Sequence, residues 1–558
     1  MQVSIDRRSG LAGWIASIDP WRVSIVLIAL ILTLPVLTVS SFVFSPSNDV
    51  WQHLVDTVLA DYVVNSIVLM IGVALGTLLI GVSTAWLTTL CEFPGKRVFS
   101  WALLLPMAFP AYIIAYTYTG TLDFAGPFQT ALRDWFDWSY GDYWFPEIRS
   151  LTGAVLMLSL VLYPYVYLLA RAAFLEQSVH ALDASRMLGC GPWRSFFVVS
   201  LPTARPAIIA GLSLALMETL ADYGTVQYFG VSTFTTGIFR TWFGLGDSAA
   251  AAQLSTMLLG FVFVLVILER GSRKRARYHH TGNRSKPLPA YRLPTGRAWL
   301  AFAACALPLV LGFVLPGAQL LVWAIETAGD NFNVDFLILV MNSMGLAAVA
   351  ALLALLLALF MAYGRRMRDT PVLQAAVRVA SLGYAVPGTV IAVGVMLPFG
   401  WLDNSIDSWA RDNLGFSTGL ILSGTLFALM FAYMVRFLAV SLQTVEAGLG
   451  KIKPTMDESA MTLGYRPPEV LRRIHVPLMK GSLLTAVLLV FVDVMKELPA
   501  TLILRPFNFN TLAVRAFEMA SDERLTDSAM AAVAIVLSGI IPVVLLSRSI
   551  SSSRKVGE

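Results

Sequence analysis

Long segments without charge dominate this sequence. Ten stretches of at least twenty residues contain no Asp, Glu, Lys or Arg: 23–48, 62–91, 98–122, 150–170, 248–268, 298–325, 336–364, 379–402, 416–435 and 528–547. Each is long enough to cross roughly 30 Å of hydrocarbon as a helix. Of the 558 residues, 57% are hydrophobic and only 13% are charged, which is more apolar surface than a soluble core can bury. The sequence therefore predicts a multi-pass protein of the lipid bilayer.

Two shorter apolar runs, 206–217 and 481–492, complete the count of spans. Each has twelve residues before an acid interrupts it, which alone suggests a core or re-entrant helix. Both follow the same repeated motif, described below, so we assign them as spans five and eleven. We expect an all-α polytopic membrane protein with about 12 transmembrane helices.

Basic residues at the span ends predict the orientation, because Lys and Arg stay preferentially on the cytoplasmic side. They cluster before span one, after spans two and eight, and most densely in the segment 269–296, whereas the opposite loop 123–149 is acid-rich. With twelve crossings both termini are cytoplasmic. The net charge of +5 then reflects this topology and no nucleic-acid binding is expected. We interpret 269–296 as a solvated linker that contacts anionic headgroups.

The first span resembles a secretory signal only superficially. Arg7 and Arg8 precede it, but its 26 charge-free residues end in no clear small-residue cleavage site, so we expect a retained anchor. Cys91, Cys190 and Cys305 form neither a disulfide framework nor a zinc-binding spacing.

The two halves of the chain are copies of one unit. The heptapeptide DASRMLG at 183–189 recurs 275 residues later as ESAMTLG at 458–464, and a proline follows each copy by thirteen residues. Other matched pairs keep this separation or one of 277, a difference that a two-residue loop change explains: Pro192 and Pro467, Arg205 and Lys480, Asn65 and Asn342, and Pro110 and Pro387. Six spans per half make this a parallel repeat. We expect halves 1–268 and 297–558, with 269–296 as the joint.

A parallel duplication predicts a pathway between the halves, near their pseudo-twofold axis. Transport is therefore the expected use. The chain has no HExxH motif and no Gly-Lys-Ser/Thr phosphate loop, so we expect a transport subunit without a cofactor and not an enzyme. Any ATP hydrolysis must come from a separate subunit. A secondary transporter driven by an ion gradient and a non-transporting scaffold are the alternatives from other classes.

The repeated motif has the properties of a short docking helix. Asp183 and Glu458 favour the positive end of a helix dipole, and the small residues beside them let another surface approach closely. Gly189 and Gly464 can end the helix in a left-handed conformation. In the second copy, Thr455 and Glu458 have the spacing of a capping box, whereas His180 takes the place of Thr455 in the first.

These residues resemble the coupling loop of ABC-importer permeases, whose consensus is Glu-Ala-Ala, three residues, Gly. The matching residues are Asp183, Ala184, Ser185 and Gly189 in the loop 171–205, and Glu458, Ser459, Ala460 and Gly464 in the loop 436–480. The resemblance extends over nearly the whole chain and is strongest to fused permeases of the ferric-iron type, through the segments 218–230 and 496–502. It implies the type I importer fold, in which a cytoplasmic helix of each half docks on an ATP-binding subunit.

The same resemblance implies the partners and the location. They are two copies of one ATP-binding subunit on the cytoplasmic face, a periplasmic substrate-binding protein, and a bacterial inner membrane. Ferric iron is the expected substrate. Thiamine, phosphonate, sulfate and polyamine permeases share this architecture, so these substrates remain alternatives.

Four acids interrupt the two short spans at matched positions. Glu218 and Asp222 are four residues apart, as are Asp493 and Glu497, so each pair lies on one helical face. Two interpretations remain open. The carboxylates line the pathway and meet a hard cation, together with phenol oxygens of Tyr112, Tyr116, Tyr118, Tyr223 or Tyr228; alternatively, they build a gate by pairing with Arg240, Lys496 or Arg505. No metal site is assigned.

Overall fold

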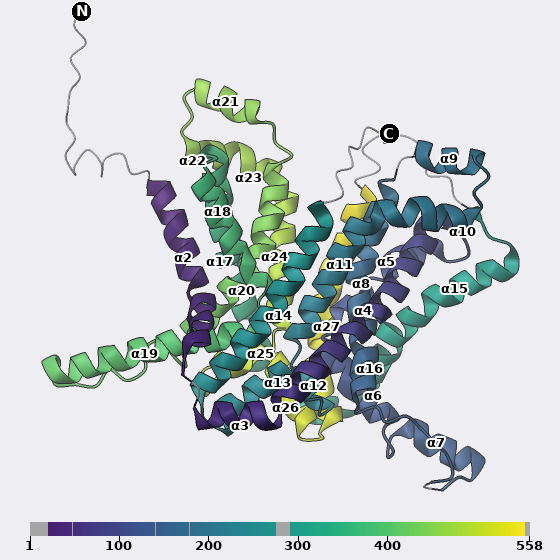
Figure 1. Ribbon diagram of the computed structural model, residues 1–558, viewed down its shortest axis with the longest axis horizontal. Helices are drawn as coiled ribbons and strands as arrows, with labels where there is room; N and C mark the ends of the chain where they lie inside the picture. The colour runs from purple at the N-terminus through teal and green to yellow at the C-terminus, as the bar shows by residue number, and fades with distance from the viewer. Residues whose placement is uncertain (1–19, 47, 140, 178, 275–290, 553–558) are drawn as a thin grey trace, which may run out of the picture.

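The computed structural model describes residues 20–552 except residues 47, 140, 178 and 275–290, and this part of the chain is almost entirely helical (Figure 1). Its strands are β1 (Cys91–Glu92) and β2 (Tyr291–Arg292), which pair in parallel with Cys91 opposite Tyr291. This small sheet attaches the start of the second half to the end of a first-half span. Most of the predicted linker 269–296, and Arg7 and Arg8 before span one, lie outside the described residues.

The first half contains thirteen described α-helices: α2 (Pro20–Ser41), α3 (Asp49–Thr57), α4 (Leu59–Leu90), α5 (Lys96–Ala102), α6 (Ala111–Leu122), α7 (Pro127–Phe136), α8 (Leu151–Leu175), α9 (Val179–Met187), α10 (Pro192–Ser195), α11 (Leu201–Ala221), α12 (Gly224–Tyr228), α13 (Phe234–Phe239) and α14 (Ser248–Lys274). Short 3-10 turns lie at Phe42–Phe44 and Leu105–Ala108, and single π-turns at Phe196–Ser200 and Arg240–Gly244.

The second half repeats this order: α15 (Thr295–Leu309), α16 (Leu315–Asn331), α17 (Val334–Met367), α18 (Pro371–Ala380), α19 (Gly388–Leu414), α20 (Leu426–Leu449), α21 (Pro454–Thr462), α22 (Pro467–Val470), α23 (Val476–Leu478), α24 (Lys480–Met495), α25 (Pro499–Leu504), α26 (Leu512–Ser521) and α27 (Leu525–Ser552). A 3-10 turn lies at Ser381–Ala385, and π-turns lie at Val310–Val314 and at Leu471–His475, the latter termed η7.

The spans agree with the prediction in number, but several differ in shape. Within the described residues, ten helices are long and apolar enough to cross a membrane, or up to twelve if two bent helix pairs each count as one span. The run 206–217 belongs to one continuous helical segment, Pro192–Ala221, and is not a short helix. The run 481–492 is the second arm of a pair bent by 81°.

Matched prolines interrupt both halves. Pro110 precedes α6 and Pro387 precedes α19, and each has an extended backbone with ψ near 140°. A proline cannot donate the backbone hydrogen bond that would continue a helix, so spans predicted at 98–122 and 379–402 are broken there. The first of these is bent by 90°.

The same three-helix arrangement forms the core of each half. Helices α4, α8 and α11 pack together in the first half, as α17, α20 and α24 do in the second. On α4, a Cβ at Gly76 would lie 2.3 Å from the Ser159 hydroxyl oxygen of α8, so only glycine permits this approach. Helix α4 also exposes Leu75 and Leu79, as a surface that faces lipid does.

The first spans are exchanged between the halves. Helix α2 of the first half packs against α18 and α19 of the second, and α15 and α16 of the second pack against α4, α5 and α6 of the first. Figure 1 shows α9 and α21 at one end of the molecule and α3, α7 and α26 at the other. The helices between these two ends form the body that holds the site.

Candidate functional site

The two copies of the repeated motif form α9 and α21, which project from the same end of the molecule (Figure 1). Asp183 and Ala184 of α9 are exposed, as are Glu458 and Ser459 of α21, whereas Ser185 and Ala460 are buried beneath them. Next to these positions, Met187, Leu188 and Leu463 expose 88%, 82% and 78% of their surface. Each helix therefore presents an acid and bare apolar side chains away from the body, as a protein-docking surface does.

Both helices end in the same way. Gly189 and Gly464 have φ angles of 78° and 88°, which confirms the predicted left-handed conformation. The amide of Cys190 donates to the Ser185 carbonyl at 3.0 Å, and the amide of Tyr465 donates to the Ala460 carbonyl at 3.1 Å. These bonds satisfy a free carbonyl in each last turn, in the Schellman pattern.

The start of α21 shows that the predicted capping box is wrong. Helix α21 begins at Pro454 after Lys453, and no side chain caps it. Thr455 already lies inside the first turn, so it forms no capping box with Glu458. Proline at the first helical position, where a missing amide costs nothing, takes the place of the predicted cap. Pro192 and Pro467 likewise begin the following helices, α10 and α22.

A cavity of about 100 Å³ lies between the halves, in the body of the molecule, and all four predicted acids line it. Glu218 lies near the end of α11 and Asp222 follows that helix, while Asp493 and Glu497 have the matching positions at the end of α24. The lining also includes two bases, Arg436 and Lys496, both from the second half. The acids therefore outnumber the bases by two.

Arg436 connects the acids of the two halves. One of its nitrogens lies 3.3 Å from a Glu497 oxygen, and another lies 3.8 Å from an oxygen of Glu218, in the first half. The guanidinium is buried, and its Nε has no hydrogen-bond partner. It is thus held by long contacts that leave part of its hydrogen-bonding capacity unused.

The remaining acids have local partners as well. Asp493 pairs with Lys496 at 3.0 Å. Asp222 accepts hydrogen bonds from the Thr225 hydroxyl and the Val226 amide, and Glu497 accepts one from the Ala500 amide. Asp222 and Glu497 therefore hold the starts of the short helices α12 and α25, so a structural role and a place in the cavity coincide.

The other expected partners lie elsewhere. Arg240 donates to the Ser232 hydroxyl, and Arg505 pairs with Glu518. Of the five tyrosines, Tyr112 and Tyr223 line the cavity.

The other three tyrosines are not cavity-lining residues. Tyr118 donates to the Leu311 carbonyl, Tyr228 lies under the Arg149 guanidinium, and Tyr116 packs between Tyr112 and Tyr228.

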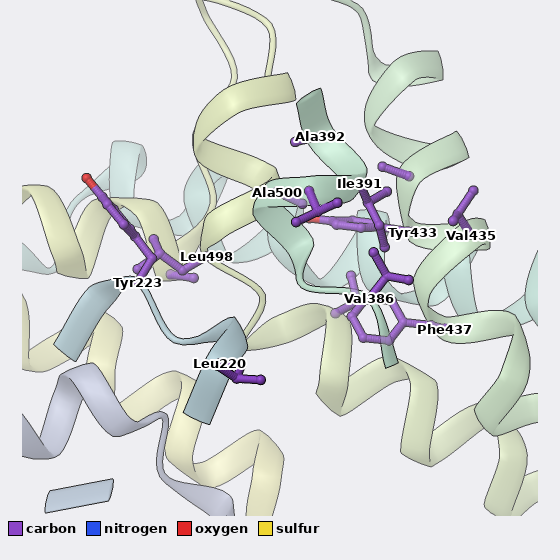
Figure 2. Packing of buried hydrophobic residues seen from close by; sticks show 14 of the residues in the cluster. Leu220, Tyr223, Val386, Ile391, Ala392, Tyr433, Val435, Phe437, Leu498 and Ala500 are labelled. Carbon is purple, nitrogen blue, oxygen red and sulfur yellow. The ribbon is translucent and has the colours of Figure 1, made fainter. Parts of the chain in front are cut away.

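Apolar side chains of several helices surround the cavity. Figure 2 shows Ile391 and Ala392 of α19, Tyr433 and Phe437 of α20, and Leu498 beside α25 in the buried apolar core, and of these Phe437 and Leu498 also line the cavity. The Tyr433 and Thr501 hydroxyls form a buried hydrogen bond of 2.7 Å. These buried apolar groups lower the local dielectric constant, so the charges beside them interact more strongly than they do in water.

Sequence reasoning missed three of the groups that line the cavity, Arg436, Tyr165 and Tyr384. Arg436 directly follows the charge-free stretch 416–435, where a span boundary was expected. Helix α20 instead continues to Leu449, which places Arg436 in its middle. The signal that could have identified Arg436 is the apolar sequence that continues after it, at Phe437–Val440.

A second ionic contact crosses between the halves at the end of the molecule opposite α9 and α21. Arg149, before α8, binds both carboxylate oxygens of Glu523 at 2.8 and 3.1 Å and lies 3.4 Å from Asp123. The hydrogen bonds from Arg149 hold the pKa of Glu523 below its ordinary value. Glu523 follows α26 in the second half, so this pair joins the halves at that end.

Comparison with known proteins identifies related transport proteins. Residues 354–556 match the family described as "Binding-protein-dependent transport system inner membrane component". The Fe(3+)-transport system permease protein FbpB 2 of Haemophilus influenzae is 27% identical over 507 residues, which are 88% of this chain and 90% of that protein. The ferric transport system permease protein FbpB of Actinobacillus pleuropneumoniae is 24% identical over 450 residues, 74% of this chain and 59% of that protein. The molybdenum transport system permease protein ModB of Escherichia coli is 29% identical over 206 residues, 35% of this chain and 87% of ModB.

Proposed function

We propose that the chain is the inner-membrane permease of a binding-protein-dependent ABC importer and that it carries ferric iron along a pathway between its two halves. As such a permease it is a multi-pass inner-membrane protein and a non-catalytic subunit. Its family implies an ATPase and a periplasmic binding protein as partners. We therefore favour this function over the two alternatives from other classes, the secondary transporter and the scaffold.

The observation that carries the substrate proposal is the charge of the cavity between the halves. Four carboxylates and two bases line it, and carboxylate oxygens suit hard cations such as ferric iron. An excess of acids opposes an oxyanion such as sulfate. The relatives named for ferric transport cover most of this chain, whereas the ModB match covers 35% of it.

The cavity supports passage of an ion and not a resident metal. Among the described residues, no three His, Cys, Asp or Glu side chains come together as a metal site. Arg436 and Lys496 pair with three of the four acids, so we propose that the cavity is a closed constriction of the pathway. Opening it separates Arg436 from Glu218, because these residues belong to different halves.

Docking of the ATP-binding subunits is the second part of the proposal. We propose that one copy of the ATP-binding subunit contacts Asp183 and Ala184 of α9 and the following Gly189. An identical copy contacts Glu458 of α21 and the following Gly464. The exposure of both helices at the same end supports this arrangement. Closure of the ATPase dimer then moves the two halves and opens the pathway alternately to each side of the membrane.

The substrate is tested by uptake in reconstituted vesicles that contain the complete complex and its cognate binding protein. Radiolabelled ferric iron should enter in an ATP-dependent manner, and radiolabelled thiamine should not. Brisk uptake of thiamine or sulfate without iron would refute the substrate and leave the permease assignment intact.

The docking role is tested by reversing the charge of an exposed residue. Glu458→Lys should lower uptake at least tenfold while the protein still inserts, because the side chain lies on the proposed contact surface. Asp412→Lys is the matched control, since Asp412 is also exposed but lies at the end of α19. Equal uptake by the native chain and Glu458→Lys contradicts the docking assignment.

A further inference from the structure

A buried ionic network attaches α21 to the body of the second half. Asp457, on the inner side of α21, contacts Arg366 Nε through one oxygen at 2.7 Å and His475 Nε2 through the other at 2.5 Å. Asp457 is 5% exposed and His475 is completely buried. The carboxylate thus joins α21 to the end of α17 and to η7.

The same network extends to α20 and α22. Arg366 also donates to the carbonyls of Leu449, at 2.5 Å, and Ile452, at 2.9 Å, where α20 ends. Tyr363, one turn before Arg366, donates to the Pro467 carbonyl at 2.6 Å and packs edge-on against the His475 ring. Helices α17, α20 and α22 and the turn η7 are therefore joined around α21 by directional contacts.

Among the described residues of the first half, the three positions equivalent to this triad carry uncharged side chains. With the separations of 275 and 277 residues, Leu182 takes the place of Asp457, Ser200 that of His475, and Thr89 that of Arg366. Leu182 is buried in an apolar cluster that includes Trp86, Phe174 and Phe196.

Between α9 and α10 of the first half, the hydroxyl groups of Ser185 and Ser195 share a hydrogen bond of 2.9 Å. The place that holds an ion triad in one half holds aromatic and aliphatic packing in the other. The two docking helices are thus attached to their halves by different kinds of contact.

We propose that Asp457 is a positioning residue that makes α21 move as one body with α17 and α20, whereas α9 shifts relative to its own spans during the transport cycle. Charged hydrogen bonds are strong and fix geometry, while apolar contact is non-directional and tolerates sliding. Movement of the ATP-binding subunits is then transmitted to the membrane spans mainly through the second half. The proposal rests on the permease family and not on the identity of the cargo.

The test compares Asp457→Asn with Glu446→Gln in the complete complex, reconstituted in vesicles with the cognate binding protein. The asparagine keeps the shape of the side chain and removes its charge. Glu446 is a matched control because it pairs with the adjacent Arg365 at 2.7 Å, at the end of α20 and away from α21. We measure uptake and ATP hydrolysis on the same vesicles and compare their ratio.

Asp457→Asn should lower the amount of cargo moved per ATP at least tenfold, with ATP hydrolysis within twofold of the native rate. Glu446→Gln should leave the ratio unchanged. Leu182→Ala, at the equivalent position of the first half, should lower the ratio less than threefold. If Asp457 only stabilises the fold, uptake and hydrolysis fall together and the ratio stays constant, which overturns the proposal.

A second variant keeps the test independent of folding yield. Arg366→Gln removes the other partner of the same ion pair. The double variant Asp457→Asn with Arg366→Gln should therefore move as much cargo per ATP as either single variant. If the double variant lowers the cargo moved per ATP by the product of the two single effects, the two residues do not act through one contact and the proposal is wrong.

Discussion

Replacing Arg436 by glutamine tests whether a single buried guanidinium holds the two halves together at the cavity. Its contact with Glu497 lies within the second half, whereas its contact with Glu218 crosses to the first. Arg436→Gln removes both contacts, and Glu218→Gln removes only the one that crosses. The pair of variants therefore separates stability of the fold from closure of the pathway.

The interaction energy of Arg436 with the two carboxylates follows from the two distances. At an effective dielectric constant of about 20, charges 3.3 Å apart attract by about 5 kcal/mol and charges 3.8 Å apart by about 4 kcal/mol, before desolvation is subtracted. Desolvation takes back most of this, and loss of one partner of a buried pair costs about 3–5 kcal/mol. Glu218 is 28% exposed, so its share is smaller, and we assign about 1.4 kcal/mol to the contact between the halves. That energy corresponds to about a tenfold shift in the opening equilibrium.

The assay measures how fast a membrane-impermeant maleimide labels a cysteine at Ala221, a buried residue of the cavity wall, in a Cys190→Ser background. Labelling should be about tenfold faster in Glu218→Gln and at least as fast in Arg436→Gln. Lys96→Gln is the control, because it breaks a surface pair with Glu92 that is worth less than about 1 kcal/mol. Native labelling rates in both cavity variants would refute the bridging role of Arg436.

Three further outcomes follow from local geometry. Gly464→Ala should cost only about 1 kcal/mol, because a Cβ there meets no atom within 4 Å and only the left-handed backbone is strained, which thermal unfolding in detergent measures. Gly383→Ala should abolish the folded yield in size-exclusion chromatography, since its Cβ would lie 1.8 Å from the Val435 carbonyl oxygen. Glu523→Gln should lower the melting temperature by the same amount from pH 5 to pH 8. Arg149 lowers the pKa of Glu523, so the stabilisation is present above the ordinary glutamate pKa and the two proteins should converge only as the pH falls through the lowered value.

The repeat made much of the architecture predictable. Charge-free runs report burial in lipid directly, because charged groups in hydrocarbon are costly, and a constant separation between the halves reports duplication. The left-handed Gly189 and Gly464 followed from the same reasoning, since glycine adopts that conformation at little cost. Even the convergence of four acids on one cavity was foreseen as an alternative from their spacing.

Packing decided what local patterns left open. The capping box at Thr455 was wrong because Pro454 starts the helix one residue earlier, a competition between two signals that spacing alone does not resolve. Arg436 was missed because an arginine after an apolar run is read as a span end, although its carboxylate partners lie up to 218 residues away along the chain.

By itself, the sequence determined that this protein lies in a membrane, that it is duplicated, and which helix projects from each half. Hydropathy, repetition and helix termination depend on neighbours along the chain. Only the tertiary structure decided that Arg436 joins acids of both halves and that Asp457 fastens α21 through charges where Leu182 fastens α9 through apolar contact. These contacts join segments that are distant in sequence, and their energies depend on distance and burial, which exist only after the helices have packed.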